Sequence, residues 1–123
     1  MKRIARTIAC ALLFIALLSC AAGAQELRVD FYDVGKADAM LITLPGGQRI
    51  LIDAATNAEG KELVKRFKRE GVDAIDLMII THFDKDHVGG ADKMIEDLRV
   101  AQVLMPAYEK DSKQYTQFLE AME

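Results

Sequence analysis

The sequence is poor in the residues that usually cross-link small domains, because cysteine occurs only at Cys10 and Cys20 and tryptophan is absent. Both cysteines lie within the first 24 residues, so the rest of the chain can form no internal disulfide and offers no thiolate to a metal. Histidine occurs only twice in 123 residues. A metal site after residue 24 must therefore be built from imidazole and carboxylate groups.

An excess of basic residues is also lacking. Lysine and arginine together number 16, against 19 acidic residues, for a net charge of −3. The first 24 residues carry three basic residues and no acidic ones, so the remainder has a net charge of −6. Surfaces that bind polyanions show the opposite balance. The composition therefore indicates no clear nucleic-acid surface, and the basic cluster over residues 65–69 is explained as the solvated face of a helix.

The first 24 residues have the order of a secretory signal peptide. Three basic residues precede an apolar run over residues 8–18, and Ala22-Gly23-Ala24 follows as a cleavage site between small residues. The apolar run is shorter than a membrane span, so we favour a cleaved leader over an anchor. We predict a signal peptide over residues 1–24 and one secreted or periplasmic domain over residues 25–123.

A lipoprotein is the alternative to simple secretion. The segment Leu17-Leu18-Ser19-Cys20 resembles a bacterial lipobox, which would leave the mature protein anchored through a lipid on Cys20. The small-residue site downstream favours cleavage after Ala24.

Hydrophobic periodicity predicts a domain that mixes strands and helices. We predict strands over residues 27–33, 38–44, 49–53, 75–80 and 100–105, and helices over residues 61–70, 91–98 and 111–122. The turn at Pro45-Gly46-Gly47 predicts that the first three strands form an antiparallel meander. The nearly continuous apolar run over residues 75–80 predicts a central strand that is buried on both faces.

The segment that follows this strand holds the candidate site. Four side chains that can bind a metal, His82, Asp84, Asp86 and His87, fall within six residues and include both histidines of the protein. Thr81 can end the strand, after which a loop can turn the four side chains toward one point, and Gly89-Gly90 allows a tight turn after them. The alternative is a solvated, charged loop with two incidental histidines.

Two motifs carry a resemblance to a known family. The segment His82-Phe83-Asp84-Lys85-Asp86-His87 resembles the His-x-His-x-Asp-His signature of the metallo-β-lactamase superfamily, with Asp84 in place of its second histidine. The segment Asp33-Val34-Gly35-Lys36-Ala37-Asp38-Ala39 resembles the Asp-Val-Gly-Gln-Gly-Asp-Ala segment of competence proteins of the ComEC/Rec2 type, from which Lys36 and Ala37 depart. The resemblance covers about residues 27–106.

This resemblance implies a fold and a ligand set. The implied fold is the α/β (α+β) αββα sandwich of the superfamily, of which this chain would form the N-terminal half only. His82 and Asp84 would hold one divalent metal ion, and Asp86 and His87 a second. Zn²⁺ is the expected ion, with Mn²⁺ as an alternative because Asp84 is a harder ligand than histidine. The later ligands of the family would have to come from outside this chain.

Two further carboxylates receive supporting roles from the resemblance. Asp53 would support the metal loop through hydrogen bonds, and Asp38 would lie near the mouth of the site. The alternatives are a strand-ending carboxylate for Asp53 and a turn cap for Asp38.

The implied function is a secreted metal-dependent hydrolase. Hydroxide formed between the two metals would attack an ester, amide or phosphodiester of unidentified structure, and Asp86 would act as the catalytic residue that orients it. A non-catalytic binding or accessory module, or a non-functional fragment with half a metal site, are the alternatives. A half sandwich would also leave one sheet face without a partner, which predicts aggregation or a homodimer.

Overall fold

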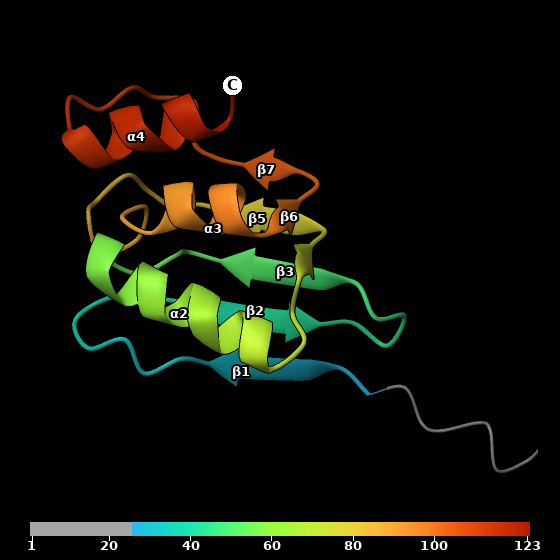
Figure 1. The fold of residues 1–123 in the computed structure, drawn as a ribbon. Coiled ribbons are helices and arrows are strands. Elements are labelled where there is room, and N and C mark those ends of the chain that lie inside the picture. Colours follow the sequence, from blue (N-terminus) through green and yellow to red (C-terminus); the bar gives the residue numbers. More distant parts are fainter. Residues whose placement is uncertain (1–25) are drawn as a thin grey trace, which may run out of the picture.

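The computed structural model describes residues 26–123, so the predicted signal peptide and the lipobox cysteine lie outside the described residues. Five strands form one mixed sheet in the spatial order β1-β2-β3-β5-β7 (Figure 1). Their bounds are β1 Arg28–Phe31, β2 Met40–Thr43, β3 Arg49–Ile52, β5 Leu77–Ile79 and β7 Val103–Leu104. The first three strands are antiparallel and β5 and β7 continue in parallel, which confirms the predicted meander at the start of a mixed sheet.

Two of the predicted strands are each divided in the structure. The prediction over residues 75–80 becomes β4 (Ala74–Ile75) and β5, and the one over residues 100–105 becomes β6 (Arg99–Val100) and β7. β4 and β6 pair with each other in a separate two-stranded sheet. The division occurs at Asp76, whose Oδ2 accepts the Arg49 N–H at 2.7 Å while its own N–H donates to the Arg49 carbonyl at 2.9 Å. The Asp76 side chain thus accepts a backbone hydrogen bond that a carbonyl of the neighbouring strand would accept in a regular sheet.

Helix α2 (Asn57–Arg69) begins four residues before the predicted start at residue 61. Thr56 caps it, because its side-chain oxygen accepts the Glu59 N–H at 3.4 Å. The pattern of threonine followed three residues later by glutamate is a helix-start signal, so this boundary was readable in the sequence. The other two helices, α3 (Ala91–Asp97) and α4 (Lys113–Ala121), lie within the predicted ranges.

Helices α2 and α3 lie side by side over one face of the sheet, and α4 lies beside α3 near β7 (Figure 1). The core sits between this helix layer and the sheet. The apolar stripe of α2 (Leu63, Val64 and Phe67) is buried there. On α4, Phe118 is fully buried, whereas Met122, the C-cap residue that follows the helix, is 37% exposed.

The opposite face of the sheet carries apolar side chains without a covering layer within residues 26–123. Strand register places Phe31, Met40, Ile52, Ile79 and Leu104 in one row across all five strands. Phe31 is 78% exposed and Leu104 57% exposed. A second row on this face contains Val29, Ile42, Ile50 and Leu77. We call these nine residues the open sheet face.

This arrangement corrects the prediction that residues 75–80 are buried on both faces. Met78 and Ile80 are buried under the helices, whereas Leu77 and Ile79 are half-buried on the open sheet face. The continuous apolar pattern reflects two apolar faces of the strand, of which only one is covered in this chain. Among residues 26–123, no helix combines the length and the apolar character that crossing a bilayer requires.

Candidate metal centre

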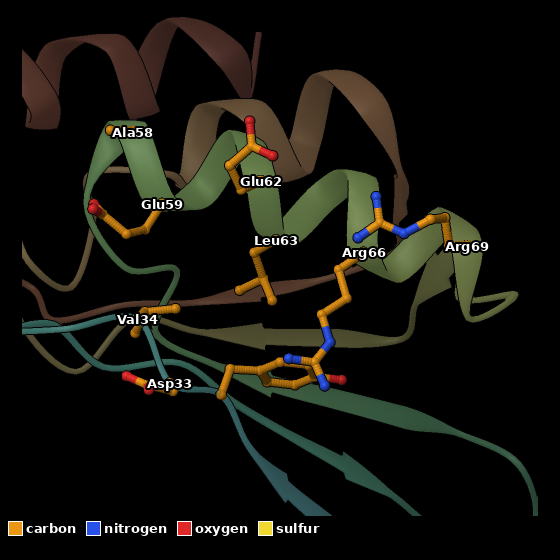
Figure 2. Close-up of a pocket in the computed structure, with 9 residues that line it drawn as sticks. Asp33, Val34, Ala58, Glu59, Glu62, Leu63, Arg66 and Arg69 are labelled. Carbon is orange, nitrogen blue, oxygen red and sulfur yellow. The ribbon is translucent and has the colours of Figure 1, made fainter.

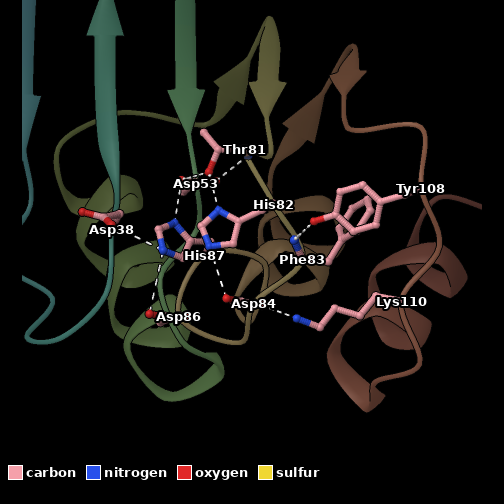
Figure 3. A network of polar contacts seen from close by, with 10 residues as sticks. All are labelled: Asp38, Asp53, Thr81, His82, Phe83, Asp84, Asp86, His87, Tyr108 and Lys110. Atoms are coloured by element: carbon pink, nitrogen blue, oxygen red, sulfur yellow. Dashed lines mark hydrogen bonds and ion pairs between the residues drawn. The ribbon is translucent and has the colours of Figure 1, made fainter.

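Three loops meet at the end of the sheet where β1, β3, β5 and β7 finish (Figure 3). They cover residues 33–39, residues 53–56, and residues 81–90, which we call the metal loop. Backbone hydrogen bonds join them: the Ala54 N–H donates to the His87 carbonyl at 2.8 Å, and the Ala55 N–H donates to the Asp38 carbonyl at 2.9 Å. The Asp38 N–H in turn donates to the Asp86 carbonyl at 3.2 Å. The candidate site is therefore held by backbone contacts between loops.

Asp53 is the buried centre of this arrangement, with only 3% of its surface exposed. Its Oδ1 accepts the Thr81 N–H at 2.8 Å, and its Oδ2 lies 2.7 Å from the Thr81 hydroxyl and 2.8 Å from His87 Nδ1. Asp53 thus accepts both hydrogen bonds of Thr81 and contacts His87, and all three contacts join it to the metal loop. Contacts of this kind are what the supporting role implied by the resemblance requires, and the role itself stays a prediction.

The backbone at Asp53 is strained. Asp53 has φ of 56° and Ala55 has φ of 59°, in the left-handed region that non-glycine residues seldom adopt. Such a conformation costs roughly 1–3 kcal/mol and persists only where surrounding contacts enforce it. Here the Asp53 N–H is bonded to the Ile79 carbonyl at 2.9 Å, in addition to the loop contacts above. Strain of this kind concentrates at functional sites.

His87 has one nitrogen bound to the protein and one facing acidic groups. Because Asp53 is an acceptor, His87 Nδ1 carries the proton in the neutral ring and Nε2 carries the lone pair. Nε2 lies 3.5 Å from Asp38 Oδ2 and 3.8 Å from Asp86 Oδ2. The side chain is only 14% exposed, so this orientation is fixed by packing as well as by hydrogen bonding.

His82 lies beside His87, with ring centroids 3.8 Å apart and planes tilted by 46°. Its Nδ1 is 3.0 Å from the Thr81 hydroxyl, and its Nε2 is 3.5 Å from Asp84 Oδ2. Both histidines thus turn Nε2 toward a carboxylate on the solvent side of the loop (Figure 3).

These donors suit a divalent metal by chemistry, because imidazole Nε2 and carboxylate oxygen are ligands of Zn²⁺ and Mn²⁺. The structure brings His82 near Asp84, and it brings His87 near two carboxylates, those of Asp38 and Asp86. Within residues 26–123, no group of three or more such side chains converges into a site that could hold an ion. The ligand assignments and their division between two metals stay predictions.

Sequence reasoning missed Lys110, which lies in the loop between β7 and α4. Its ammonium group contacts Asp84 Oδ1, leaving Asp84 Oδ2 for His82. The hydrogen bond from Lys110 holds the pKa of the Asp84 carboxyl below its ordinary value. The signal for this residue was topological: parallel neighbouring strands end at the same sheet edge, so the loop after β7 had to approach the loop after β5.

Tyr108 in the same loop was also missed. The Phe83 N–H donates to the Tyr108 hydroxyl oxygen at 3.3 Å, and the two rings pack edge to face with centroids 5.0 Å apart. Phe83 is 1% exposed and also contacts Tyr115 of α4. The apolar residue inside the metal motif therefore anchors the loop to the core.

Gly89 and Gly90, which follow His87 closely, are required for lack of space and not for an unusual φ angle. Neither has a positive φ, unlike Gly35, Gly47 and Gly71. A Cβ on Gly90 would lie 2.7 Å from the Gly60 Cα and still closer to the Ala54 carbonyl oxygen. The metal loop thus needs glycine because the backbones of α2 and the strained loop approach it closely.

Two hollows lie near the candidate site. One, of about 350 Å³, is lined by Phe83, Asp84, Lys85, Asp86, Lys110, Ser112 and Gln114. The other, of about 340 Å³, is lined by Phe31, Tyr32, Asp38, Ala39, Met40, Ile52 and Asp53. The first is lined by the candidate ligands Asp84 and Asp86, and the second by the supporting residues Asp38 and Asp53.

A further hollow of about 330 Å³ lies between α2 and the segment after β1, and no residue of the metal loop lines it (Figure 2). Tyr32 forms its floor under the Arg66 guanidinium, whose central carbon is 4.7 Å from the ring centroid. The Tyr32 hydroxyl donates to Glu70 Oε2 at 3.3 Å. These contacts explain its shape as packing of α2 on the sheet, separate from the candidate metal centre.

Comparison with known proteins supplies independent findings. Residues 32–123 match a family model described as "Metallo-beta-lactamase superfamily". Among curated proteins, ComE operon protein 3 of Bacillus subtilis is 26% identical over 117 residues, covering 80% of this chain and 15% of that protein. Recombination protein 2 of Haemophilus influenzae is 29% identical over 99 residues, covering 76% of this chain and 12% of that protein.

A third relative, an octanoyltransferase of Porphyromonas gingivalis, is 34% identical over 65 residues, or 53% of this chain and 12% of that protein. The chain thus spans 15% or less of the length of these curated relatives.

Proposed function

Because this chain belongs to the metallo-β-lactamase superfamily, we propose that it contributes the metal loop of a metal-dependent hydrolase acting on an ester or phosphodiester. The observation that carries the proposal is the shared orientation of the two histidines. Each has Nδ1 bound within the protein and Nε2 turned to a carboxylate at 3.5 Å. Metal-binding histidines have this arrangement, in which the second nitrogen is held by an acceptor.

The proposed roles follow from these pairs. His82 Nε2 and Asp84 Oδ2 hold one divalent ion, and His87 Nε2 and Asp86 hold a second, with Asp38 beside it. We propose Zn²⁺ as the ion, with Mn²⁺ as the alternative that the acid-rich ligand set also suits. Lys110 keeps Asp84 charged and directs one of its oxygens toward His82.

Bound divalent metal would supply Lewis-acid activation of water and of the substrate oxygen where charge develops. The protein contributes the rest. Asp86, whose side chain is 39% exposed, offers Oδ2 to orient the attacking water and to take its proton. Lys85 lines the hollow next to Asp84 and Asp86 and provides a cation for a negatively charged substrate oxygen. This favours a phosphodiester or another small anionic ester.

We propose that the reaction takes place outside the cytoplasm. The support is the order of residues 1–24: basic residues, an apolar run and a small-residue cleavage site. N-terminal sequencing of the exported protein is expected to find Gln25 as the first residue. A lipid-modified Cys20 at the N-terminus would show instead that the protein is anchored to a membrane.

A non-catalytic binding module is the second candidate. It is favoured by the absence, within residues 26–123, of any three candidate ligands that converge on one point. A tetrahedral zinc site takes four ligands, so each histidine–carboxylate pair needs additional ones. Metal binding without turnover is the expected property of such a module.

The ligand roles can be tested by substitution of Asp86. In the full-length protein, which supplies the remaining ligands, we expect Asp86→Ala to weaken Zn²⁺ or Mn²⁺ binding at least tenfold and to abolish hydrolysis of a generic phosphodiester, because it removes a ligand and the group that orients water. In this chain alone we expect no turnover. Isothermal calorimetry and a colorimetric phosphodiester assay measure the two effects. Asp97→Asn is the control. Asp97 lies at the end of α3, is exposed, and pairs with Lys68 of α2.

Equal losses in Asp86→Ala and Asp97→Asn, or retention of both properties in Asp86→Ala, would contradict the proposed roles. Metal binding that depends on Asp86 without any turnover in the full-length protein would instead establish the binding module.

A further inference from the structure

Thr81 stands between the buried carboxylate of Asp53 and the imidazole of His82. Its hydroxyl oxygen is 2.7 Å from Asp53 Oδ2 and 3.0 Å from His82 Nδ1. Its backbone N–H also donates to Asp53 Oδ1 at 2.8 Å. The hydroxyl and the backbone N–H of Thr81 are therefore tied to the same carboxylate, and a β-branched side chain has little freedom left at χ1.

The direction of each hydrogen bond follows from proton counting. A hydroxyl has one proton to donate and lone pairs with which to accept. The Asp53 carboxylate can only accept, so the Thr81 proton points to Asp53 Oδ2. Toward His82 the hydroxyl can then only accept, and Nδ1 must be the protonated nitrogen of the neutral ring. Nε2 is left with the lone pair, facing Asp84.

The same carboxylate acts directly on the other histidine, because Asp53 Oδ2 is also 2.8 Å from His87 Nδ1. One buried acid thus orients both rings, one through a direct contact and the other through a hydroxyl. The two histidines differ in what else holds them: the His87 side chain is 14% exposed, whereas that of His82 is 37% exposed. In water the neutral imidazole of a histidine side chain favours the form protonated on Nε2, which would block the nitrogen that faces Asp84.

We propose that Thr81 is a positioning residue that transmits the orientation of Asp53 to His82 and sets the tautomer with a free Nε2. The metal affinity that follows from this tautomer rests on the proposed function. The tautomer itself is a property of the metal-free chain.

The test reads the tautomers directly in metal-free residues 25–123. Nitrogen-15 correlation spectra of the imidazole groups distinguish a protonated from an unprotonated ring nitrogen, and only two histidines contribute signals. In the wild-type chain at alkaline pH we expect both rings to be protonated on Nδ1. We expect Thr81→Val, which keeps the shape and removes the hydroxyl, to convert His82 mainly to the form protonated on Nε2 while His87 stays unchanged.

Thr81→Ser is the matched control, because it keeps the hydroxyl and should keep the wild-type tautomer of His82. Thr81 is exposed, so these changes leave the core intact. In calorimetry of the full-length protein with Zn²⁺, Thr81→Val should bind about 10-fold more weakly, in line with the usual effect of losing a group that holds a metal ligand, and Thr81→Ser should bind like wild type.

A wild-type His82 protonated on Nε2 overturns the proposal without any variant. So does a Thr81→Val spectrum in which His82 keeps its tautomer, or in which both histidines change together as they would after general loosening around Asp53. If the spectra behave as expected but the full-length protein binds no Zn²⁺, the positioning role stands and the proposed metal function fails.

Discussion

At the scale of single residues, the candidate centre is the place where ordinary local preferences are overridden. Asp53 is a buried acid with a left-handed backbone, and each of these features is costly alone. Both are supported by the same set of contacts, since the backbone of residues 53–55 is bonded to the loops whose side chains the carboxylate orients. Proteins keep a strained backbone and a buried charge together mainly at sites that position other groups, where surrounding hydrogen bonds offset the lost stability.

A pH-dependence of stability is predicted at another buried residue, Tyr32. Burial, followed by the charge of Glu70, raises the pKa of its hydroxyl to about 12, from 10 in the unfolded chain. The folded state therefore holds this proton more tightly than the unfolded state. The resulting stabilisation is complete below pH 10 and is lost as pH rises from 10 to about 12.

The measurement is chemical unfolding of wild type and Tyr32→Phe at several pH values. The free energy of unfolding of wild type relative to Tyr32→Phe should be constant below pH 9 and fall by roughly 2–3 kcal/mol by pH 12, at about 1.4 kcal/mol per pH unit between the two pKa values. An absorbance titration showing that the substitution removes a phenolate that forms near pH 10 would contradict the prediction.

At the scale of secondary-structure elements, the position of the metal loop depends on how closely α2 and α3 approach each other. Gly60 in α2 and Gly90 at the start of α3 face each other, and an added Cβ on Gly60 would lie 2.5 Å from the Gly90 Cα. Gly89 has a comparable constraint, because a Cβ there would lie 2.8 Å from the Asn57 N. The start of α2 and the end of the metal loop are thus packed backbone against backbone.

We therefore expect Gly90→Ala to destabilise the domain by about 2–3 kcal/mol, at the upper end of the usual cost of overpacking, because the obstructing atoms are backbone. Urea unfolding measures the change. Gly46→Ala is the matched control: its Cβ would meet only the flexible Gln48 side chain, and its φ is not positive. Similar stability of the two variants would show that the helices can separate without cost.

At the scale of the whole molecule, the open sheet face is the dominant feature that the described chain leaves exposed. Its two apolar rows cross the sheet, and exposed apolar surfaces of this extent mark places where another layer binds. β1 is also an edge strand with Phe31 and Val29 exposed. We infer that residues 25–123 alone associate with a second copy through this face.

The expected result is that this polypeptide sediments as a dimer or larger species at micromolar concentration. Phe31→Lys should shift it toward monomer, because a charge at an exposed position of the face is costly to cover. Met122→Lys serves as the control, since Met122 is an exposed apolar residue on α4 outside the open sheet face. A well-folded monomer in the wild-type chain, or equal effects of the two substitutions, would exclude this association.

Much of the local structure was predictable from the sequence because it depends on residues that are close along the chain. The alternation in residues 28–31 and the stripe of α2 identify which side chains share a face. The metal motif falls within six residues and needed no knowledge of the fold to be recognised. Even the start of α2 was encoded locally, by Thr56 and Glu59.

Contacts between distant segments were decided only by the tertiary structure. Asp38, Asp53 and Lys110 reach the metal loop because the order β1-β2-β3-β5-β7 brings the ends of four strands to one edge, and no local periodicity specifies that order. The division of the central strand at Asp76 likewise depends on its long-range contact with Arg49. Apolar alternation reports that a side chain can be buried, whereas the partner that buries it is set by how the strands and helices pack. For this reason the sequence by itself determined the chemistry of the loop, and its family resemblance assigned Asp53 and Asp38 to the site. Only the folded chain decided which contacts Asp53 makes with the two histidines, that Lys110 joins them, and which sheet face stays open.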